Sequence, residues 1–282
     1  MSVAVIILNW NGRKYLEKFL PTLIQCSRDE AEIIVADNAS TDDSLAFLKE
    51  HHPGIRIIRN PDNGGFAKGY NLALRQVQAD YYVLLNSDIE VTENWIAPVI
   101  TMMEKDKMIG ACQPKIRSYD EPKKFEYAGA AGGFIDKYGY PFCRGRIFLA
   151  VEEDTGQYDE ASEIFWATGA CMFVRAELFH SMGGLDEDFF AHMEEIDFCW
   201  RLKNNGYNVG FFGKLGVTIK GVEKLFDEEE IYDRDDKAPN RKGYFYKKIG
   251  ADTVHLTRYT GYKAQEFIRK NASGGKPFCL SL

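Results

Sequence analysis

Apolar runs and amphipathic stretches alternate along the first 85 residues of the chain. Four short apolar runs predict strands that are buried on both faces, as the strands of a parallel sheet are. These runs span residues 3–8, 33–36, 55–58 and 81–85. Helical spacing of apolar residues is seen between them, over residues 14–24, 43–51 and 66–78. Ser40 or Thr41 is the expected N-cap of the second of these helices. This alternation predicts an α/β fold with right-handed crossovers and helices on both faces of a Rossmann-like sheet.

The pattern is less regular in the second half of the chain. Apolar positions predict helices over residues 94–103 and 194–202 and strands over residues 109–116 and 164–175, the last bent at Gly169. Between them, residues 125–148 are rich in glycine and aromatic side chains. For that segment we expect strands and loops.

Polar residues stand where each of the first four strands ends. In chain order they are Asn9, then Asp37 and Asn38, then Asn63, Gly64 and Gly65, and finally Asn86, Ser87 and Asp88. The carboxyl edge of an open α/β sheet is where such folds bind ligands. Carboxylates and amides suit a base and a ribose, and glycines let the backbone approach a ligand closely. The alternative is that these residues only form turns and helix caps.

Asp88 is the candidate for a metal-bearing carboxylate, because a buried strand delivers it to this edge. Asn86 is its neutral neighbour. The alternative is that residues 86–88 cap a helix that begins near Thr92. The first strand is followed by Asn9-Trp10-Asn11-Gly12 and not by Gly-x-Gly-x-x-Gly, which argues against a dinucleotide-binding site.

Three acids crowd the first turn of the helix expected over residues 194–202. Glu194 and Asp197 lie three apart on one face, and Glu195 is adjacent. A helix N-terminus stabilises a carboxylate, and the ionised form is the one that a general base needs. The alternative is a structural cap of the helix dipole that pairs with Arg201.

Composition excludes several functional classes. The 282 residues are 45% hydrophobic and 27% charged, with a net charge of -7, which argues against nucleic acid or an anionic membrane as the main partner. Six scattered cysteines have no zinc or redox spacing and are expected as free thiols in a reducing compartment. The N-terminal apolar run lacks a basic region before it, and no run approaches the ~20 residues of a membrane span. We expect a cytoplasmic protein.

Four stretches of the chain resemble the family-2 glycosyltransferases of the GT-A fold, and rhamnosyltransferase-like members in particular. They read Val-Ala-Val-Ile-Ile-Leu-Asn-Trp-Asn, Ile-Val-Ala-Asp-Asn-Ala-Ser-Thr-Asp, Asn-Gly-Gly-Phe-Ala-Lys-Gly-Tyr-Asn and Val-Leu-Leu-Asn-Ser-Asp. The resemblance implies that Asp37 and Asn38 contact the nucleotide base and ribose. It also implies that Asp88 ligates a divalent metal, Mg or Mn, beside the donor diphosphate. Asn86 stands where the family's Asp-x-Asp motif has its first acid, as in many rhamnosyltransferase-like members.

The implied donor-binding set is Asn9, Asp37, Asn38, Asn63, Gly64, Gly65, Asn86, Ser87 and Asp88. On the acceptor side the resemblance implies Trp166, Thr168 and Gly169, with His192 as a further polar group. It assigns the general base to Glu195. The family usually has aspartate at this place, so Glu194 and Asp197 stay open as the base.

The implied reaction is a metal-dependent, inverting hexosyl transfer. The donor is a UDP- or dTDP-sugar and the acceptor a saccharide or lipid-linked saccharide, in the synthesis of a surface polysaccharide. A non-catalytic nucleotide- or sugar-binding module is the alternative, and a sugar nucleotidyltransferase a weaker one.

We expect a catalytic domain over residues 1–213, with a donor half (1–115) and an acceptor half (116–213). Residues 214–282 form a divergent C-terminal segment without the family's His-Gly-Gly string. In this segment we expect a solvated charge run over residues 227–236. An amphipathic helix is expected over residues 257–270, which leaves open a peripheral contact with the inner face of a membrane.

Overall fold

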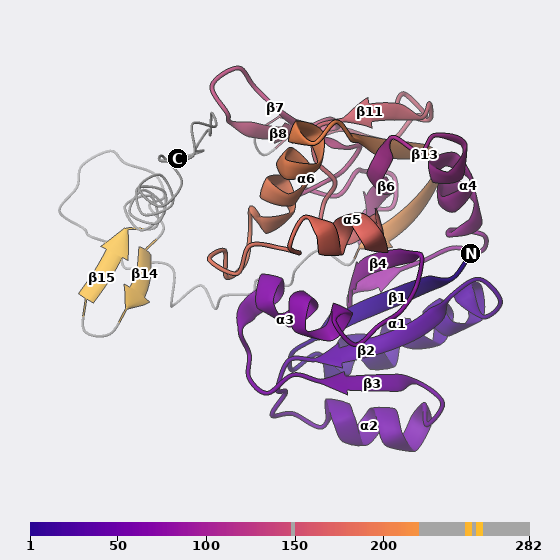
Figure 1. The fold of residues 1–282 in the computed structure, drawn as a ribbon, viewed down its shortest axis with the longest axis vertical. Coiled ribbons are helices and arrows are strands. Elements are labelled where there is room, and N and C mark those ends of the chain that lie inside the picture. The colour runs from indigo at the N-terminus through magenta and orange to yellow at the C-terminus, as the bar shows by residue number, and fades with distance from the viewer. Residues whose placement is uncertain (148–149, 220–245, 250–251, 256–282) are drawn as a thin grey trace. The chain divides into compact units, whose positions relative to one another are not determined.

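A computed structural model describes residues 1–147, 150–219, 246–249 and 252–255 (Figure 1). Its centre is a nine-stranded sheet in the order β11-β13-β6-β12-β4-β1-β2-β3, with β5 paired to β13. The strands of this sheet are β1 (Val3–Asn9), β2 (Glu32–Asp37), β3 (Arg56–Arg59), β4 (Tyr81–Asn86), β5 (Ile89–Glu90), β6 (Ile109–Ser118), β11 (Ser162–Ile164), β12 (Cys171–Arg175) and β13 (Asn208–Ile219).

Half of the strand pairings described in the sheet are parallel. Strand β1 pairs in parallel with β2 and β4, β2 pairs in parallel with β3, and β6 with β13. Strand β12 lies antiparallel between β4 and β6, and β5 and β11 are antiparallel to β13. The predicted α/β class is confirmed, and the sheet is mixed, with parallel pairing along β3-β2-β1-β4 and between β6 and β13.

Helices cover both faces of the sheet. They are α1 (Arg13–Ser27), α2 (Ser44–His51), α3 (Gly65–Leu74), α4 (Ala97–Lys105), α5 (Ala176–Ser181) and α6 (Glu194–Asn204). Successive side chains of a strand point to opposite faces, so each central strand serves two cores. On β1, Ala4 and Ile6 join the core under α3, α5 and α6, whereas Val5 and Ile7 join the core under α1, α2 and α4.

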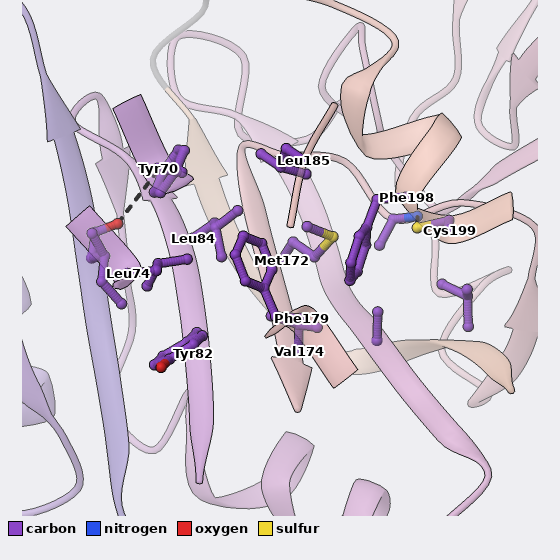
Figure 2. Close-up of a cluster of buried hydrophobic side chains, with 14 of the residues drawn as sticks. Tyr70, Leu74, Tyr82, Leu84, Met172, Val174, Phe179, Leu185, Phe198 and Cys199 are labelled. Atoms are coloured by element: carbon purple, nitrogen blue, oxygen red, sulfur yellow. Dashed lines mark hydrogen bonds between the residues drawn. The ribbon is translucent and has the colours of Figure 1, made fainter. Parts of the chain in front are cut away.

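The first of these cores fixes α6 against the sheet. Figure 2 shows Leu84 of β4 and Met172 of β12 beside the rings of α5 and α6. Phe179 of α5 and Phe198 of α6 have ring centroids 5.5 Å apart, and both are almost fully buried. Each such ring contributes roughly 2–3 kcal/mol by burial, which makes the position of α6 well defined.

Three two-stranded sheets lie outside the central one. Within the described residues they pair β7 (Gly133–Ile135) with β8 (Pro141–Cys143), β9 (Arg146–Ile147) with β10 (Ala150–Val151), and β14 (Tyr246–Ile249) with β15 (Asp252–His255). Strands and loops are therefore present in the segment 125–148, as expected. Among the described residues, no helix is long and apolar enough to cross a membrane.

The chain divides into two compact units, residues 1–134 with 142–221, and residues 135–141 with 222–282. The first contains the whole central sheet, and the second contains the β14–β15 hairpin. A boundary at residue 213 stays a prediction, and β13 continues past this position to Ile219. The charge run, the C-terminal amphipathic helix and Cys279 lie outside the described residues.

Several local expectations were wrong. Residues 164–175 are not one bent strand, because β11 pairs with β13 whereas β12 pairs with β4 and β6. The chain between them turns, and the carbonyl of Ala170 accepts a hydrogen bond from the Asn86 N–H. Neither Ser40 nor Thr41 caps α2, which starts after Asp43. The Ser40 hydroxyl instead accepts a hydrogen bond from the Asn11 N–H.

Lys115 of β6 ties the chain between β10 and β11 to the sheet. Its ammonium group donates to both carboxylate oxygens of Asp154, at 2.9 and 3.1 Å, and also pairs with Asp159. The side chains of Lys115 and Asp154 are 5% and 10% exposed, so water does not screen this pair.

We predict that Lys115→Ala lowers the free energy of unfolding by about 3 kcal/mol, because it leaves the Asp154 charge buried without a cation. Lys124→Ala is the matched control, since Lys124 pairs with Glu121 on the surface, and its cost should stay under about 1 kcal/mol. Urea titration measures both changes, and equal losses in the two variants would contradict the prediction.

Candidate active site

The ends of β1 and β2 carry a buried polar network. The Asn9 side-chain amide donates to Asp37 Oδ1 and to Ser40 Oγ, both at 3.1 Å, and the Ser40 N–H donates to Asp37 Oδ2 at 3.1 Å. Asn9 is fully buried and Asp37 is 1% exposed. Two of the predicted donor-binding residues are therefore in contact, and the Asp37 carboxylate has a fixed orientation.

Asn38 joins the loop after β2 to the loop after β3 at the same edge of the sheet. Its amide N–H donates to Asn63 Oδ1 at 2.8 Å and to the Gly65 carbonyl at 3.1 Å, and its oxygen accepts from Asn60 at 3.0 Å. The Gly65 N–H also donates to Asn63 Oδ1, at 3.1 Å. The sequence analysis did not single out Asn60, although it follows β3 directly as Asn38 follows β2.

Gly64 and Ser87 also lie at this edge. The side chain of Lys68 packs over Gly64, and a Cβ at this position would clash with it. The Ser87 hydroxyl lies 3.5 Å from the place that a Cβ on Gly12 would take, which sets the loops after β1 and β4 side by side. Asn86 is half-buried at the end of β4.

Asp88 lies in the turn between β4 and β5. It does not cap a helix, because α4 begins only at Ala97. Asp88 is 8% exposed, and burial raises the pKa of its carboxyl to about 6, although its own backbone N–H lowers this pKa in part. In the described part of the chain, no group of three His, Cys, Asp or Glu side chains is placed to hold a metal ion.

Glu126 is an acidic residue of the site that the sequence did not reveal. Burial raises the pKa of its carboxyl to about 7, and the charge of Asp88 contributes to this rise. The Glu126 N–H donates to the Ile116 carbonyl of β6 at 3.0 Å, and one carboxylate oxygen accepts from the Ala128 N–H at 2.7 Å. The surrounding segment is irregular, so no period or motif indicated this placement.

Glu194 and Glu195 open α6 as buried acids. Glu194 is 4% exposed, and in each residue one oxygen, Oε2, is buried without a hydrogen-bond partner among the described residues. Burial raises the pKa of both carboxyls, and the charge of Glu195 raises that of Glu194 further. The expectation that the helix N-terminus holds these acids ionised was wrong, because desolvation outweighs the dipole here.

Backbone strain precedes these two acids. His192 and Met193 have φ angles of 74° and 75°, a left-handed conformation that side chains other than glycine rarely adopt. Two such residues in succession cost a few kcal/mol, and strain of this kind clusters at functional sites. His192, a predicted acceptor-side residue, is exposed.

Asp197 has a structural partner. Its Oδ2 accepts from Arg201, with Nε at 2.8 Å and an Nη at 2.7 Å. Arg201 also donates to the carbonyls of Met182 and Gly184, at 2.7 and 2.9 Å. Asp197 therefore forms the ion pair with Arg201 that the structural alternative predicted. Glu194 and Glu195 remain as candidates for the general base.

Hydrogen bonds hold the predicted acceptor-side residues Trp166 and Thr168 in the fold. Trp166 is 5% exposed, and its indole N–H donates to the Phe134 carbonyl at 2.9 Å. The buried Gln113 links the segments on either side, because it accepts from the Thr168 N–H at 2.9 Å and donates to the Gly129 carbonyl at 3.1 Å.

Gly169 lies close to α3 and to Glu195, the predicted base. A Cβ at this position would lie 3.1 Å from the Phe66 ring of α3 and 3.9 Å from Cβ of Glu195. The charges of Glu126 and Glu195 both add to the rise that burial causes in the pKa of Cys143. The charge of Asp88 raises the pKa of Glu126 in the same way.

Curated relatives include transferases of rhamnose. The chain is 22% identical over 245 residues to an N-acetylglucosaminyl-diphospho-decaprenol L-rhamnosyltransferase of Mycobacterium tuberculosis, which covers 82% of this chain and 78% of the relative. It is 25% identical over 219 residues to the rhamnosyltransferase WbbL of Escherichia coli (strain K12), which covers 74% of this chain and 80% of the relative.

Solved structures share the fold. GalNAc-T7 with UDP, GalNAc and Mn²⁺ matches with a TM-score of 0.62 at 17% identity, over 78% of this chain and 44% of that chain. The mannosyltransferase PcManGT from Pyrobaculum calidifontis, in complex with GDP-Man and Mn²⁺, matches with a TM-score of 0.56 at 17% identity, over 79% of this chain and 57% of that chain. The chain thus spans about half the length of these solved structures, and the likeness confirms the expected GT-A fold.

A family model extends over most of the sheet and the strand ends described above. The model of glycosyl transferase family 2 matches residues 4–183, which include β1 through β12 and α1 through α5. This match covers well over half of the chain. The chain therefore belongs to glycosyl transferase family 2.

Proposed function

We propose that this glycosyltransferase moves a sugar, with inversion, from a UDP- or dTDP-sugar to a hydroxyl of a saccharide or lipid-linked saccharide. The observation that carries this proposal is the position of Glu195. Its Cβ lies 3.9 Å from the place that a Cβ on the acceptor-side Gly169 would take, and one of its buried carboxylate oxygens has no hydrogen-bond partner among the described residues. The rhamnosyltransferase relatives support the transfer of a hexose to a lipid-linked acceptor.

The donor nucleotide would bind where β1, β2 and β3 end. Asp37 and Asn38 are held by buried hydrogen bonds, so an imide N–H or a ribose hydroxyl meets preorganised acceptors. The loop of Asn63, Gly64 and Gly65 would border the same pocket. Preorganisation reduces the entropy lost when the nucleotide binds.

A divalent cation, Mg or Mn, fits the chemistry of Asp88. A buried carboxylate with a raised pKa is stabilised by a nearby cation, and carboxylate oxygen is a preferred ligand of hard metals. Asp88 would hold the ion, with the donor phosphates and water as the remaining ligands. When bound, the cation offsets the charge of the departing diphosphate.

Glu195 would act as the general base. It takes the proton from the acceptor hydroxyl as this oxygen attacks the anomeric carbon and the bond to the diphosphate breaks. Glu195 suits this role better than Glu194, because the charge of Glu195 raises the pKa of Glu194 further, and better than Asp197, which pairs with Arg201. One base opposite the leaving group gives inversion, with no carboxylate needed as a nucleophile.

The wider setting is proposed on the same basis. Thr168 and Gly169 would border the acceptor, with Trp166 as their buried support. We place the reaction in the synthesis of a surface polysaccharide, at the cytoplasmic side of a membrane. Residues 1–213 would form the catalytic domain, and residues 214–282 an appendage.

The test begins with a panel of UDP-, dTDP- and GDP-sugars in the presence of Mn²⁺ or Mg²⁺, with release of the nucleoside diphosphate as the readout. We predict that Glu195→Gln lowers kcat by about 10²–10⁴-fold, because the base is lost, while UDP or dTDP affinity in calorimetry stays within about twofold. The exposed Glu177→Gln on α5 is the control and should retain full activity.

Asn86, a neutral residue in place of an acid, favours the second candidate, a non-catalytic nucleotide-binding module. Nucleotide binding without any release of nucleoside diphosphate would support that candidate. Absence of nucleotide binding, with or without metal, would contradict both functions, and full turnover by Glu195→Gln would exclude Glu195 as the base.

We further predict a pH dependence of kcat at saturating donor. Burial raises the pKa of Glu195 above the ordinary value of about 4.3, and the base is active only when deprotonated. Activity is therefore full above the raised pKa and is lost as pH falls through it, well before an exposed glutamate would titrate. A rate that stays constant from pH 8 down to pH 5 would contradict the assignment.

A further inference from the structure

Helix α3 holds the segment of residues 184–190 at two points. At its start, the Phe66 N–H donates to the Phe190 carbonyl at 2.7 Å. In its last turns, Asn71 Oδ1 accepts from the Leu185 N–H at 2.9 Å, and Asn71 Nδ2 donates to the Leu185 carbonyl at 2.8 Å and to Glu187 Oε1 at 3.1 Å. Asn71 is 5% exposed, so these hydrogen bonds face little competition from water.

Both points of attachment require glycine. Gly65 has a φ of 84°, and a Cβ there would clash with the carbonyl of Phe190 and lie 2.7 Å from its ring. Gly184 has a φ of 76°, and a Cβ there would clash with Oδ1 of Asn71. The backbone conformation of the two segments is thus adapted to this contact.

The segment connects directly to the proposed base. Residues 184–190 lead through the left-handed His192 and Met193 into α6, whose second residue is Glu195. Arg201 of α6 holds the Gly184 carbonyl from the other side. The N-terminal loop of α3 is the donor loop that Asn63 and Asn38 organise. Helix α3 therefore lies between the donor loop and the chain that sets the base.

We propose that Asn71 is a positioning residue for Glu195 and acts through residues 184–190. This proposal rests on the proposed function. Asn71 closes the string Asn63–Asn71, whose first residues border the donor pocket, and its three hydrogen bonds all go to the segment before α6. Helix α3 thereby fixes the position of Glu195 relative to the donor loop.

The experiment compares Asn71→Ala with the wild type, using the nucleotide sugar that turns over in the donor panel and the matching nucleoside diphosphate as binding probe. We predict a fall in kcat of at least tenfold, because the segment that sets Glu195 loses its attachment. The affinity for the nucleoside diphosphate should stay within twofold. In the Glu195→Gln background, Asn71→Ala should lower kcat by less than a further twofold.

Arg75→Ala is the matched control. Arg75 pairs with Glu187 of the same segment at 3.8 Å, but on the surface, so this variant should keep kcat within twofold. If the fold-loss of kcat in the double variant equals the product of the losses in the two single variants, the proposal is overturned. It is also overturned if the nucleotide affinity of Asn71→Ala falls as much as its kcat. Asn71→Asp, which keeps the hydrogen bond from the Leu185 N–H, replaces Asn71→Ala if the latter does not fold.

Hydrogen exchange tests the same inference without a donor sugar. In Asn71→Ala the amides of residues 197–201, the first that are hydrogen-bonded within α6, should exchange faster than in the wild type, while those of β1 keep their protection. Unchanged exchange at the start of α6 would overturn the proposal. If the wild type releases no nucleoside diphosphate at all, the proposed function fails, and the exchange experiment still decides whether Asn71 positions α6.

Discussion

The register of β1 between β2 and β4 is the constraint on which the site depends. Asn9 pairs with Asp37 across one parallel ladder, and Leu8 pairs with Asn86 across the other. The polar ends of three strands therefore reach the same level at the carboxyl edge. Because side chains alternate between faces, a shift of β1 by one residue against its neighbours would turn each of its side chains to the opposite face. Such a shift would disrupt both hydrophobic cores. Two hydrophobic cores thus fix the position of polar groups that contribute little to stability themselves.

Desolvation is what raises the pKa values of the acids in the site. Asp88, Glu126 and the pair at the start of α6 all have raised pKa values, and burial is the main cause in each case. A helix N-terminus favours ionised carboxylates by at most about 2 kcal/mol, which removal from water exceeds here. A site of this kind attracts cations and takes up protons readily. Both properties suit a reaction in which a diphosphate departs and a hydroxyl loses its proton.

The sequence predicted features that depend on neighbouring residues and missed those that depend on distant ones. Buried runs such as residues 3–8 fixed the strands, and strand ends fixed the place of Asp37 and Asp88. Glu126 and Asn71 escaped notice because their partners lie 38 and 114 residues away, at Asp88 and Leu185, and only the folded chain brings them together. The direction of the pKa shifts was missed for the same reason, since burial is a property of the whole fold.

Strand β3, at one end of the central sheet, has a consequence for how copies of the protein behave in concentrated solution. It is four residues long and both begins and ends with an exposed arginine, Arg56 and Arg59. An open strand edge is a template for pairing with another chain, and short length and like charges oppose such pairing. The short length and charged ends of β3 therefore oppose edge-to-edge pairing of two copies at this border of the sheet.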